Sequence, residues 1–354
     1  MVSKCVMKPS FDLFKELDQL DPSSSPDEPF GITLQHRFAN VPEEERGWAR
    51  SFVEGFHAAD PSRISTHSII AGDHAEQETD GHRGFHIAGG YRRLVESLCN
   101  DLAPMVEVRT ASVVTRRRMG PRPGHRRSKT ELRRNFPGQR PASGSGLASR
   151  RAPKKAARPR GRGFQPFTCR KRRSLAQTQY GICGTPDAAI RFLFWEDGTH
   201  MGDKTLPDLH FLFTRHPVFP TFWTAMPLRL PLLVAWSAGP SAAAKAGWSQ
   251  QRLEKEALHA LTRILGLPED ALGRRFVRSY FHDWQADKFS RGAYSYVLAG
   301  GMEAQALLAL PLGNRLFFAG EATQSDGHHA TVHGAYASGL RAAEEILASS
   351  QQKS

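Results

Sequence analysis

Apolar residues recur at helical spacing in several segments of the chain. Between residues 249 and 265 a leucine or alanine returns every fourth residue, after a serine that can cap a helix. A second stripe, Leu94, Leu98 and Leu102, follows Gly89-Gly90-Tyr91. Residues 1–47 show a polar, helical pattern, and 49–58 predict another helix that ends at Asp60-Pro61.

Short apolar runs bounded by proline and glycine predict strands between these helices. The expected strands are 106–114, 189–195, 209–214, 222–225, 232–236, 276–281 and 316–318. Helices and strands mixed in this way favour an α/β protein, with a region of α+β character where short strands cluster. At 354 residues the chain is long enough for two or three domains.

The segment from Leu316 to Ala335 carries the most informative pattern. The apolar run 316–318 ends at Gly320-Glu321, and a helix opens near Thr331 with small residues. Gly320 allows a ligand to approach the backbone, and Glu321 offers a carboxylate to a ribityl or ribose hydroxyl. The helix start offers amides and a positive dipole end to an anion or an electron-rich ring edge. These features indicate a dinucleotide site, although an ordinary packing unit with a glycine turn has the same spacing.

The helix that follows carries an apolar stripe on one side and charged residues on the other. The stripe consists of Val332, Tyr336, Leu340, Ala343 and Leu347.

The net charge of +13 suggests a nucleic-acid or membrane partner, but the distribution of charge changes that interpretation. Of the 48 basic residues, 21 lie between Arg116 and Arg173, and only one of the 35 acidic residues does, so this segment carries +20 and the remainder −7. The segment is rich in Arg, Pro, Gly and Ser, which predicts disorder. Nonspecific nucleic-acid binding is expected of it.

Two further observations bear on compartment and metals. The four cysteines show neither paired nor metal-ligand spacing, which favours reduced thiols and a cytoplasmic location. No apolar signal segment or membrane span is expected, because residues 218–239 are interrupted by Pro and Arg. His328, His329 and His333 have a spacing that can seat a metal, but loop and pocket roles are favoured beside a helix start.

The motifs of the C-terminal third together resemble the flavin-containing amine oxidases, which include monoamine and polyamine oxidases and histone lysine demethylases. They are Trp284 with Asp-Lys-Phe-Ser-Arg-Gly-Ala-Tyr-Ser-Tyr, then Phe-Phe-Ala-Gly-Glu-Ala-Thr, then Ala-Thr-Val-His-Gly-Ala. The resemblance covers residues 40–114 and 174–350. It implies the FAD-dependent amine oxidase fold, with an FAD domain and a substrate domain.

The resemblance also implies roles for residues at matching positions. Gly320 and Glu321 would meet the pyrophosphate and ribityl region of FAD, Thr331 and Val332 would face the flavin, and Trp284 would pack on its ring. Val113 is the candidate on the adenine side. The implied substrate pocket holds Tyr294, Phe289, Thr331 and His329. With no cysteine between Glu321 and Thr331, FAD would be bound noncovalently.

The implied reaction is oxidation of a small-molecule amine, a polyamine or monoamine, to an imine. Oxygen then reoxidises the flavin and hydrogen peroxide forms. On this interpretation the expected organisation is a helical part of the substrate domain at 1–104, an FAD-domain strand at 105–115 and the basic segment at 116–173. The substrate domain continues over 174–300, and a C-terminal FAD-binding segment covers 301–350.

The chain departs from the family pattern at three places. No βαβ unit with Gly-x-Gly-x-x-Gly precedes Phe11, the basic segment stands where the family has a strand, and Thr185 aligns with the usual lysine near the flavin. A frame-shifted or retained non-coding stretch over roughly 115–173, or as far as 187, accounts for the last two. The alternatives are therefore a catalytically inactive amine-oxidase-like protein that binds nucleic acid through 116–173, and a chromatin-directed demethylase.

Overall fold

The computed structural model divides the chain into two compact units. Unit 1 comprises Met1–His86 and Phe167–Ser354, and unit 2 comprises Ile87–Pro166. The structure describes residues 12–79, 87, 89–102, 105–109, 112–117, 130–134, 178–180, 183–184, 186–190, 193–197, 205–214 and 216–351.

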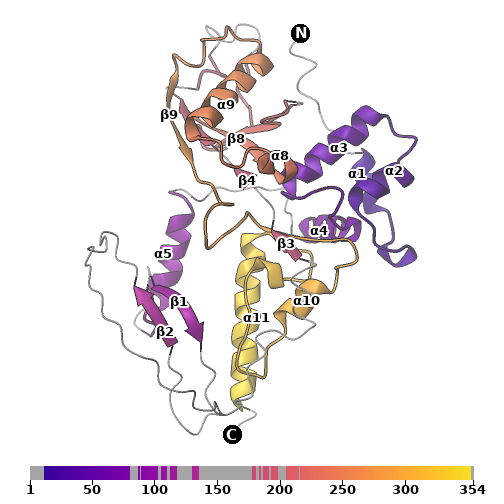
Figure 1. Cartoon of the computed structure of the whole chain (residues 1–354), viewed down its shortest axis with the longest axis vertical. Helices are drawn as coiled ribbons and strands as arrows, with labels where there is room; N and C mark the ends of the chain where they lie inside the picture. Colours follow the sequence, from indigo (N-terminus) through magenta and orange to yellow (C-terminus); the bar gives the residue numbers. More distant parts are fainter. Residues whose placement is uncertain are drawn as a thin grey trace, which may run out of the picture. The chain divides into compact units, whose positions relative to one another are not determined.

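A six-stranded antiparallel sheet forms one half of unit 1 (Figure 1). Its strands run in the order β6-β7-β8-β5-β9, and β4 also pairs with β8. They are β4 (Cys183–Gly184), β5 (Pro186–Ile190), β6 (Phe211–Phe213), β7 (Thr221–Thr224), β8 (Leu232–Ala238) and β9 (Phe276–Phe281). Two helices accompany them, α8 (Gly239–Ala243) and α9 (Gln250–Leu265).

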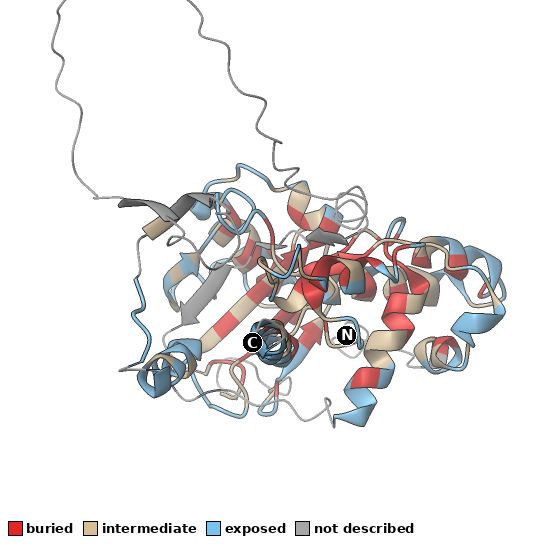
Figure 2. Cartoon of the chain, turned by 90° about the horizontal axis from the view of Figure 1, so that it is seen from below, coloured by how far each residue is buried: buried red, intermediate tan, exposed pale blue. Residues whose placement is uncertain are grey.

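The sheet and α9 share one hydrophobic core. Buried and half-buried residues alternate along β7 and β8, as a strand with one covered face requires. Figure 2, coloured by burial, shows strands on which buried (red) and half-buried (tan) positions follow one another. Leu233 of β8 and Phe222 of β7 pack in the same cluster as Leu253 and Leu261 of α9. The helix predicted over 249–265 is confirmed, and Ser249 caps it by accepting a hydrogen bond from the Arg252 amide.

Four helices near the N-terminus enclose a second core. They are α1 (Asp12–Asp18), α2 (Phe30–His36), α3 (Glu43–Phe56) and α4 (Thr66–Glu78), with the short helix η2 (Pro22–Ser24) between α1 and α2. Leu17, Phe30 and Ile69 are fully buried in this core, and Tyr296 of the C-terminal part joins it. The N-terminal helices and Tyr296, although far apart in the sequence, therefore share one hydrophobic core.

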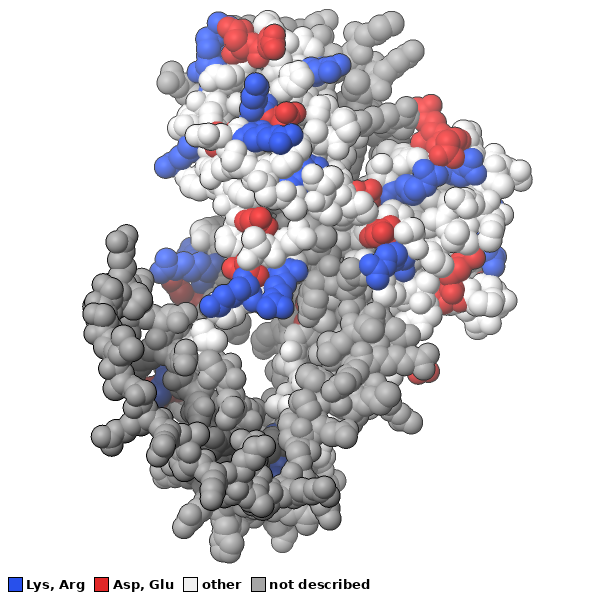
Figure 3. Space-filling view, viewed as in Figure 1, with Lys and Arg blue, Asp and Glu red and all other residues white. Residues whose placement is uncertain are grey.

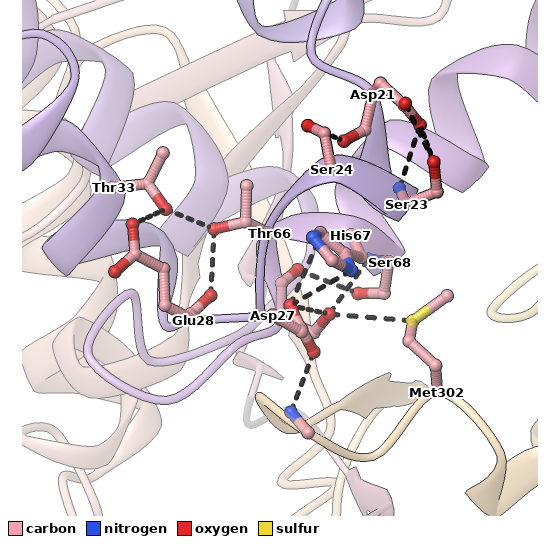
Figure 4. A network of polar contacts seen from close by, with 12 residues as sticks. Asp21, Ser23, Ser24, Asp27, Glu28, Thr33, Thr66, His67, Ser68 and Met302 are labelled. Atoms are coloured by element: carbon pink, nitrogen blue, oxygen red, sulfur yellow. Dashed lines mark hydrogen bonds and ion pairs between the residues drawn. The ribbon is translucent and has the colours of Figure 1, made fainter.

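Asp27 ties the helical core to the C-terminal part of unit 1 (Figure 4). Its carboxylate accepts hydrogen bonds from the Ser65 hydroxyl at 2.9 Å and from the Gly300 amide at 2.7 Å. Ser65 caps α4 by accepting from the Ser68 amide, and the Ser65 hydroxyl also contacts the sulfur of Met302. One half-buried carboxylate thus joins the start of α4 to the turn after residue 298.

The C-terminal part contains a two-stranded ladder and three helices. Strand β10 (Ser295–Val297) pairs antiparallel with β3 (Thr178–Tyr180). Helix α10 (Ala304–Ala309), η4 (Glu321–Thr323) and α11 (Val332–Gln351) follow. The strand predicted over 316–318 is wrong: within the described residues Leu316 forms only an isolated bridge with Leu312. An apolar run becomes a strand only when a neighbouring strand pairs with it.

The apolar stripe predicted on the last helix is exposed in the structure. Val332, Tyr336, Leu340 and Leu347 have exposed fractions of 52%, 56%, 52% and 64%. The helix instead buries small residues, Gly334, Ser338 and Ala342. Periodicity identified the helix correctly, but the face that packs within unit 1 is the one with the smaller side chains.

Unit 2 contains one helix and a strand pair. Helix α5 (Tyr91–Leu102) lies where the leucine stripe predicts it. Strand β1 (Ser112–Arg117) pairs antiparallel with β2 (Thr130–Arg134), and the register sets Val114 opposite Leu132. Within the basic segment, residues 116–117 and 130–134 belong to these two strands, and the disorder expected over 116–173 stays a prediction. Most of the segment lies outside the described residues.

Two other strand predictions need correction. Residues 106–109 are not a strand, so β1 begins six residues later than the predicted start. Residues 193–197 form a turn, in which Phe194 and Trp195 are buried against the core of the sheet instead of extending β5. Bulky apolar residues favour burial, and burial is possible in a turn as well as in a strand.

The described surface has no strong bias of charge on the face shown in Figure 3. Acidic and basic side chains are interspersed there, as on an ordinary solvated surface. Among the described helices, none combines the length and the apolar character needed to cross a membrane.

Candidate functional site

A cavity of about 740 Å³ lies between the helical core, the sheet and the loop before α11. Its volume is within the range of ligand pockets, roughly 300 to 1,000 Å³. We call it the aromatic cavity. Its lining residues are Trp48, Ser51, Phe52, Gly55, Phe56, His57, Gly72, Asp73, Glu76, Thr79, Phe211, Phe213, Thr214, Pro220, Thr221, Trp223, Trp236, Tyr294, Gly327, His328, His329, Ala330, Thr331 and His333.

One wall of the cavity is a ladder of rings on α3. Trp48, Phe52 and Phe56 follow one another at a spacing of four residues, so they lie on the same face of the helix. Their ring centroids are 5.3 and 5.4 Å apart, and both pairs are stacked. His57 continues the ladder, with its ring edge-on to Phe56 at 5.2 Å. The sequence spacing thus builds a continuous apolar wall.

The sheet supplies a second aromatic wall. Trp223 of β7 lies 5.3 Å from Trp236 of β8 and 6.0 Å from Phe211 of β6, measured between ring centroids. Trp236 also joins the two walls, because its indole N–H donates to the Gly55 carbonyl at 2.9 Å. The Tyr294 hydroxyl donates to the Phe56 carbonyl at 2.5 Å. These two bonds hold the end of α3 against the sheet and against the segment before β10.

Glu321 fixes the loop that forms the third side of the cavity. One carboxylate oxygen accepts from the Ser295 amide at 3.0 Å. The other accepts from the Ser295 hydroxyl at 2.7 Å and from the Ala330 amide at 2.8 Å. Ala330 has a φ of 61°, a conformation that costs energy for a residue with a side chain. The charge-assisted bond from its amide helps to hold it there.

Thr331 closes the start of α11. Its hydroxyl donates to the His328 carbonyl at 2.6 Å and accepts from the Gly334 amide at 3.0 Å, as an N-cap residue does. The amides of Val332 and His333 belong to the first turn of the helix, where N–H groups lack intrahelical acceptors. The cavity therefore ends at a helix N-terminus, which carries a partial positive charge.

Two histidines of the cavity lining, His57 and His329, are held in neutral form by burial. Burial is the main cause that lowers the pKa of His57, to about 3, and the nearby His329 adds to the shift. Burial likewise lowers the pKa of His329, although Glu321 acts in the opposite direction. His329 is only 8% exposed, and within the described part of the chain its buried Nδ1 has no hydrogen-bond partner. Both imidazoles therefore add polarity to the cavity without adding charge.

The predicted histidine cluster does not form a metal site in the described residues. The His333 and His328 rings lie 3.1 Å apart, from Nε2 to Nδ1. No group of three His, Cys, Asp or Glu side chains with the arrangement of metal ligands occurs among the residues that the structure describes. All three histidines line the aromatic cavity, and their roles stay a prediction.

Asp73 and Glu76 introduce negative charge on the side formed by α4. Burial raises the pKa of Asp73 to about 6, and Glu76 and Asp18 raise it further. His74 acts in the opposite direction and is itself 2.9 Å from Asp18, from Nε2 to Oδ1. A half-buried carboxylate therefore faces a cavity that is otherwise aromatic.

The structure brings together some of the residues singled out in the sequence. Tyr294, His329 and Thr331 all line the aromatic cavity. Gly320 lies just before Glu321 with its amide donating to the Ser338 hydroxyl at 2.9 Å, and Val332 is exposed at the start of α11.

Trp284 and Phe289 are not among the residues that line the cavity. Trp284 is 42% exposed and packs edge-on against His282, and Phe289 is 67% exposed. Val113 lies in β1 of unit 2, and Thr185 falls outside the described residues. The roles inferred for these residues stay predictions.

Most of the cavity lining was not singled out from the sequence. Asp73 sits in no motif, His57 lies in a segment (52–60) that resembles the family's substrate domain but was given no role, and the aromatic residues of α3 and the sheet come from segments far apart in the chain. The four-residue spacing of Trp48, Phe52 and Phe56 was the one available signal. An aromatic stripe at this spacing is also typical of a helix that faces an ordinary core.

Parts of the chain are similar to known proteins. Residues 148–347 match the family described as flavin containing amine oxidoreductase. A histone demethylase-like protein A of Aspergillus fumigatus is 40% identical over 136 residues, which are 37% of this chain and 12% of that protein. Lysine-specific histone demethylase 1 homolog 2 of Arabidopsis thaliana is 40% identical over 119 residues, 33% of this chain and 16% of that protein. The chain therefore matches only a small part of each relative.

Among solved structures, a double mutant of putrescine oxidase aligns with a TM-score of 0.60 and 15% sequence identity. The alignment covers 98% of this chain and 72% of that one. At this identity the likeness shows the fold alone, and it confirms the amine oxidase fold class predicted from the C-terminal motifs. Because the family match spans more than half of the chain, the protein belongs to the flavin-containing amine oxidoreductase family.

Proposed function

We propose that the chain oxidises an amine to an imine with noncovalently bound FAD and releases hydrogen peroxide. The observation that carries the proposal is the aromatic cavity, which is closed on one side by the N-terminus of α11. When bound, FAD supplies the acceptor for a hydride from the carbon beside the amine nitrogen, and oxygen takes up the electrons.

The residues around the start of α11 fit the ring end of a flavin. Gly320 has a φ of 132°, and a Cβ placed there would meet nothing within 4 Å, so a ligand can approach the backbone closely. The first-turn amides beyond Thr331 are suited to the negative charge of a reduced ring edge. We assign Thr331 and Val332 to this contact, and Gly320 to the pyrophosphate and ribityl region of FAD.

Glu321 fits the flavin contact less directly. Its two oxygens already accept three hydrogen bonds from Ser295 and Ala330, and a carboxylate has roughly four acceptor sites. One site remains for a ribityl hydroxyl. We therefore assign to Glu321 the positioning of the loop and, through that fourth site, the predicted contact with the cofactor.

The cavity prepares an amine for oxidation by favouring its uncharged form. Removal of an ammonium group from water is costly, and an apolar lining shifts the equilibrium toward the neutral amine. The stacked rings of α3 and the tilted rings of the sheet give both walls an apolar surface, and Tyr294 completes the aromatic lining near α11. The neutral imidazoles of His57 and His329 add no positive charge that would repel the substrate.

The absorption spectrum of the full chain tests the proposal. Purified protein incubated with FAD and freed of excess should show flavin bands near ~450 nm and release hydrogen peroxide when butylamine is added. The variant Trp223→Ala, which opens one aromatic wall, should bind FAD but release peroxide more slowly. A colourless protein after incubation with FAD contradicts the proposal. A coloured protein that oxidises no amine supports the catalytically inactive alternative.

The names of the relatives favour a second candidate substrate, a methylated lysine side chain of a histone. Both relatives described above are named as histone demethylases or demethylase-like proteins. The same peroxide assay separates the candidates, with butylamine and a dimethyl-lysine peptide supplied at equal concentration. A clear preference for the peptide would favour demethylation over oxidation of a small amine.

A further inference from the structure

Met302 lies at the junction between the helical core and the C-terminal part of unit 1. Its sulfur is 3.6 Å from the Ser65 hydroxyl oxygen (Figure 4). Ser65 is fully buried, and the same hydroxyl donates to the Asp27 carboxylate at 2.9 Å. A thioether sulfur is a weak acceptor, so the carboxylate holds the larger share of the hydroxyl hydrogen. Two acceptors of unequal strength therefore compete for one buried donor.

The Ser65 hydroxyl also fixes the start of α4. It accepts from the Ser68 amide at 2.9 Å, which makes Ser65 the N-cap residue of the helix. Helix α4 in turn supplies Gly72, Asp73 and Glu76 to the lining of the aromatic cavity. A chemical change at the Met302 sulfur is therefore passed, through one hydroxyl group, to a helix that forms one side of the cavity.

The Met302 side chain is open to small oxidants. The residue is 37% exposed, although its sulfur lies against a buried hydroxyl. Hydrogen peroxide is hardly larger than water and can reach a side chain exposed to this degree. It transfers one oxygen atom to the sulfur: the O–O bond breaks, an S–O bond forms, the sulfur loses two electrons, and water leaves. Met105 in unit 2 is 84% exposed and provides an internal reference for this reaction.

Oxidation changes the acceptor that faces Ser65. A sulfoxide is polar where the thioether was apolar, and its oxygen is a much stronger acceptor than sulfur. It therefore competes with Asp27 for the single hydroxyl hydrogen, and its negative end lies beside a carboxylate. Asp27 then keeps the amides of His67 and Gly300 but loses its hydroxyl donor. The start of α4 is held less firmly as a result.

We propose that Met302 is a peroxide-sensitive modification site, whose oxidation to the sulfoxide loosens the start of α4. The site itself does not depend on the proposed function, because peroxide from any source oxidises the sulfur. Its regulatory role does rest on the proposed function. In a chain that releases hydrogen peroxide, oxidation of Met302 makes turnover self-limiting, since α4 lines the cavity that holds the amine.

Hydrogen peroxide added to the purified full chain tests the site without FAD or amine. The peroxide is titrated until mass spectrometry of tryptic peptides shows complete oxidation of Met105. Met302 should be converted to the sulfoxide in the same samples, and the unfolding temperature should fall by about 2 to 4 °C, as the loss of a hydrogen bond to a charged group predicts. Methionine sulfoxide reductases should restore the unfolding temperature.

Two leucine variants separate Met302 from other residues that peroxide attacks, and each is compared with itself before and after peroxide. Met302→Leu keeps a similar volume but has no sulfur, so its unfolding temperature should change by less than about 1 °C. Met105→Leu should show the full decrease. Hydrogen exchange at the Ser68 amide should accelerate after oxidation of the wild-type chain and stay constant in Met302→Leu.

Two results would overturn the inference. One is that Met302 stays reduced when Met105 is fully oxidised. The other is that peroxide lowers the unfolding temperature of Met302→Leu as much as that of the wild-type chain.

A turnover experiment tests the self-limiting role separately. With FAD and butylamine, consumption of the amine should slow progressively in the wild-type chain, and either catalase or Met302→Leu should sustain it. A chain that consumes no amine loses the proposed function, but it keeps the modification site if added peroxide gives the expected result. A chain that turns over at a constant rate while Met302 becomes oxidised keeps the proposed function and loses the self-limiting role.

Discussion

Glu321 is the residue that holds the loop before α11 in place. Its carboxylate accepts from two amides and one hydroxyl, and Gln at this position would turn an NH₂ group toward one of those donors. Glu321→Gln should therefore lower the free energy of unfolding by about 2 kcal/mol, because a buried donor loses its acceptor. Urea unfolding measures the change, and hydrogen exchange at the Ala330 amide should accelerate.

Glu344→Gln, at an exposed position on α11, is the matched control and should leave stability within about 0.5 kcal/mol. Equal stability of the Glu321→Gln and wild-type chains would mean that the carboxylate does not hold the loop.

Individual residues differ in how far they can be predicted from sequence. Gly320 and Glu321 lie in a turn whose composition suggests ligand binding. The structure adds that Glu321 also accepts hydrogen bonds from Ser295 and Ala330 and so holds the loop before α11. Asp73 could not have been singled out, because it sits in a polar helix with no motif around it. Its position in an aromatic cavity follows only from the packing of α4 against the loop that contains Gly327.

Two glycines of α11 offer a matched test of how that helix packs. A Cβ at Gly334 would lie 2.0 Å from the His328 carbonyl oxygen, which is backbone and cannot easily move. Gly334→Ala should therefore destabilise the chain by about 3 kcal/mol through overpacking. At Gly339 a Cβ would meet nothing within 4 Å. Gly339→Ala should stabilise by up to about 1 kcal/mol, since Ala favours the helix interior.

Thermal and urea unfolding of both variants gives the comparison, and far-ultraviolet circular dichroism checks helix content. If Gly334→Ala were as stable as wild type, the loop would not be packed on the first turn of α11 as the structure shows.

At the scale of elements, prediction worked where the pattern is local. The helix at 250–265 and the strand at 276–281 match their predicted ranges, because capping, periodicity and chain breakers all lie within those segments. The run 316–318 failed because strand formation depends on a neighbour that the pattern does not reveal. In α11 the period was right, but the choice of buried face depends on which side meets the rest of unit 1.

At the scale of the whole molecule, the cavity combines residues between 48 and 57, 72 and 79, 211 and 236, and 327 and 333. Sequence motifs identified only the last of these groups and Tyr294. The cavity also places groups with opposite pKa shifts in one region. Burial lowers the pKa of His57 to about 3 and raises that of Asp73 to about 6. Their contributions to stability therefore change with pH in opposite directions.

The sign of each contribution follows from which state binds the proton. The imidazole of His57 protonates near 6.5 in the unfolded chain but not in the folded one, so stability is lost as pH falls below 6.5. Asp73 binds its proton near pH 6 when folded and near 3.8 when unfolded, so stability is lost as pH rises from 3.8 to 6. Between pH 4 and 6 the two groups partly cancel.

Removal of either group should change how steeply the free energy of unfolding depends on pH. Asp73→Asn should make the acid-induced loss of stability between pH 6 and 4.5 steeper, and His57→Phe should make it shallower. Each slope should change by about 0.5 to 1 kcal/mol per pH unit. This is less than the ~1.4 kcal/mol per pH unit that binding of one full proton gives, because both side chains are only partly buried.

Urea unfolding at pH 4.5, 5.25, 6 and 7 measures the slopes. If the wild-type, Asp73→Asn and His57→Phe chains gave parallel curves of unfolding free energy against pH, the cavity would not shift the pKa values of these two groups. The double variant should restore a slope close to wild type, since the two opposing protons are then both absent.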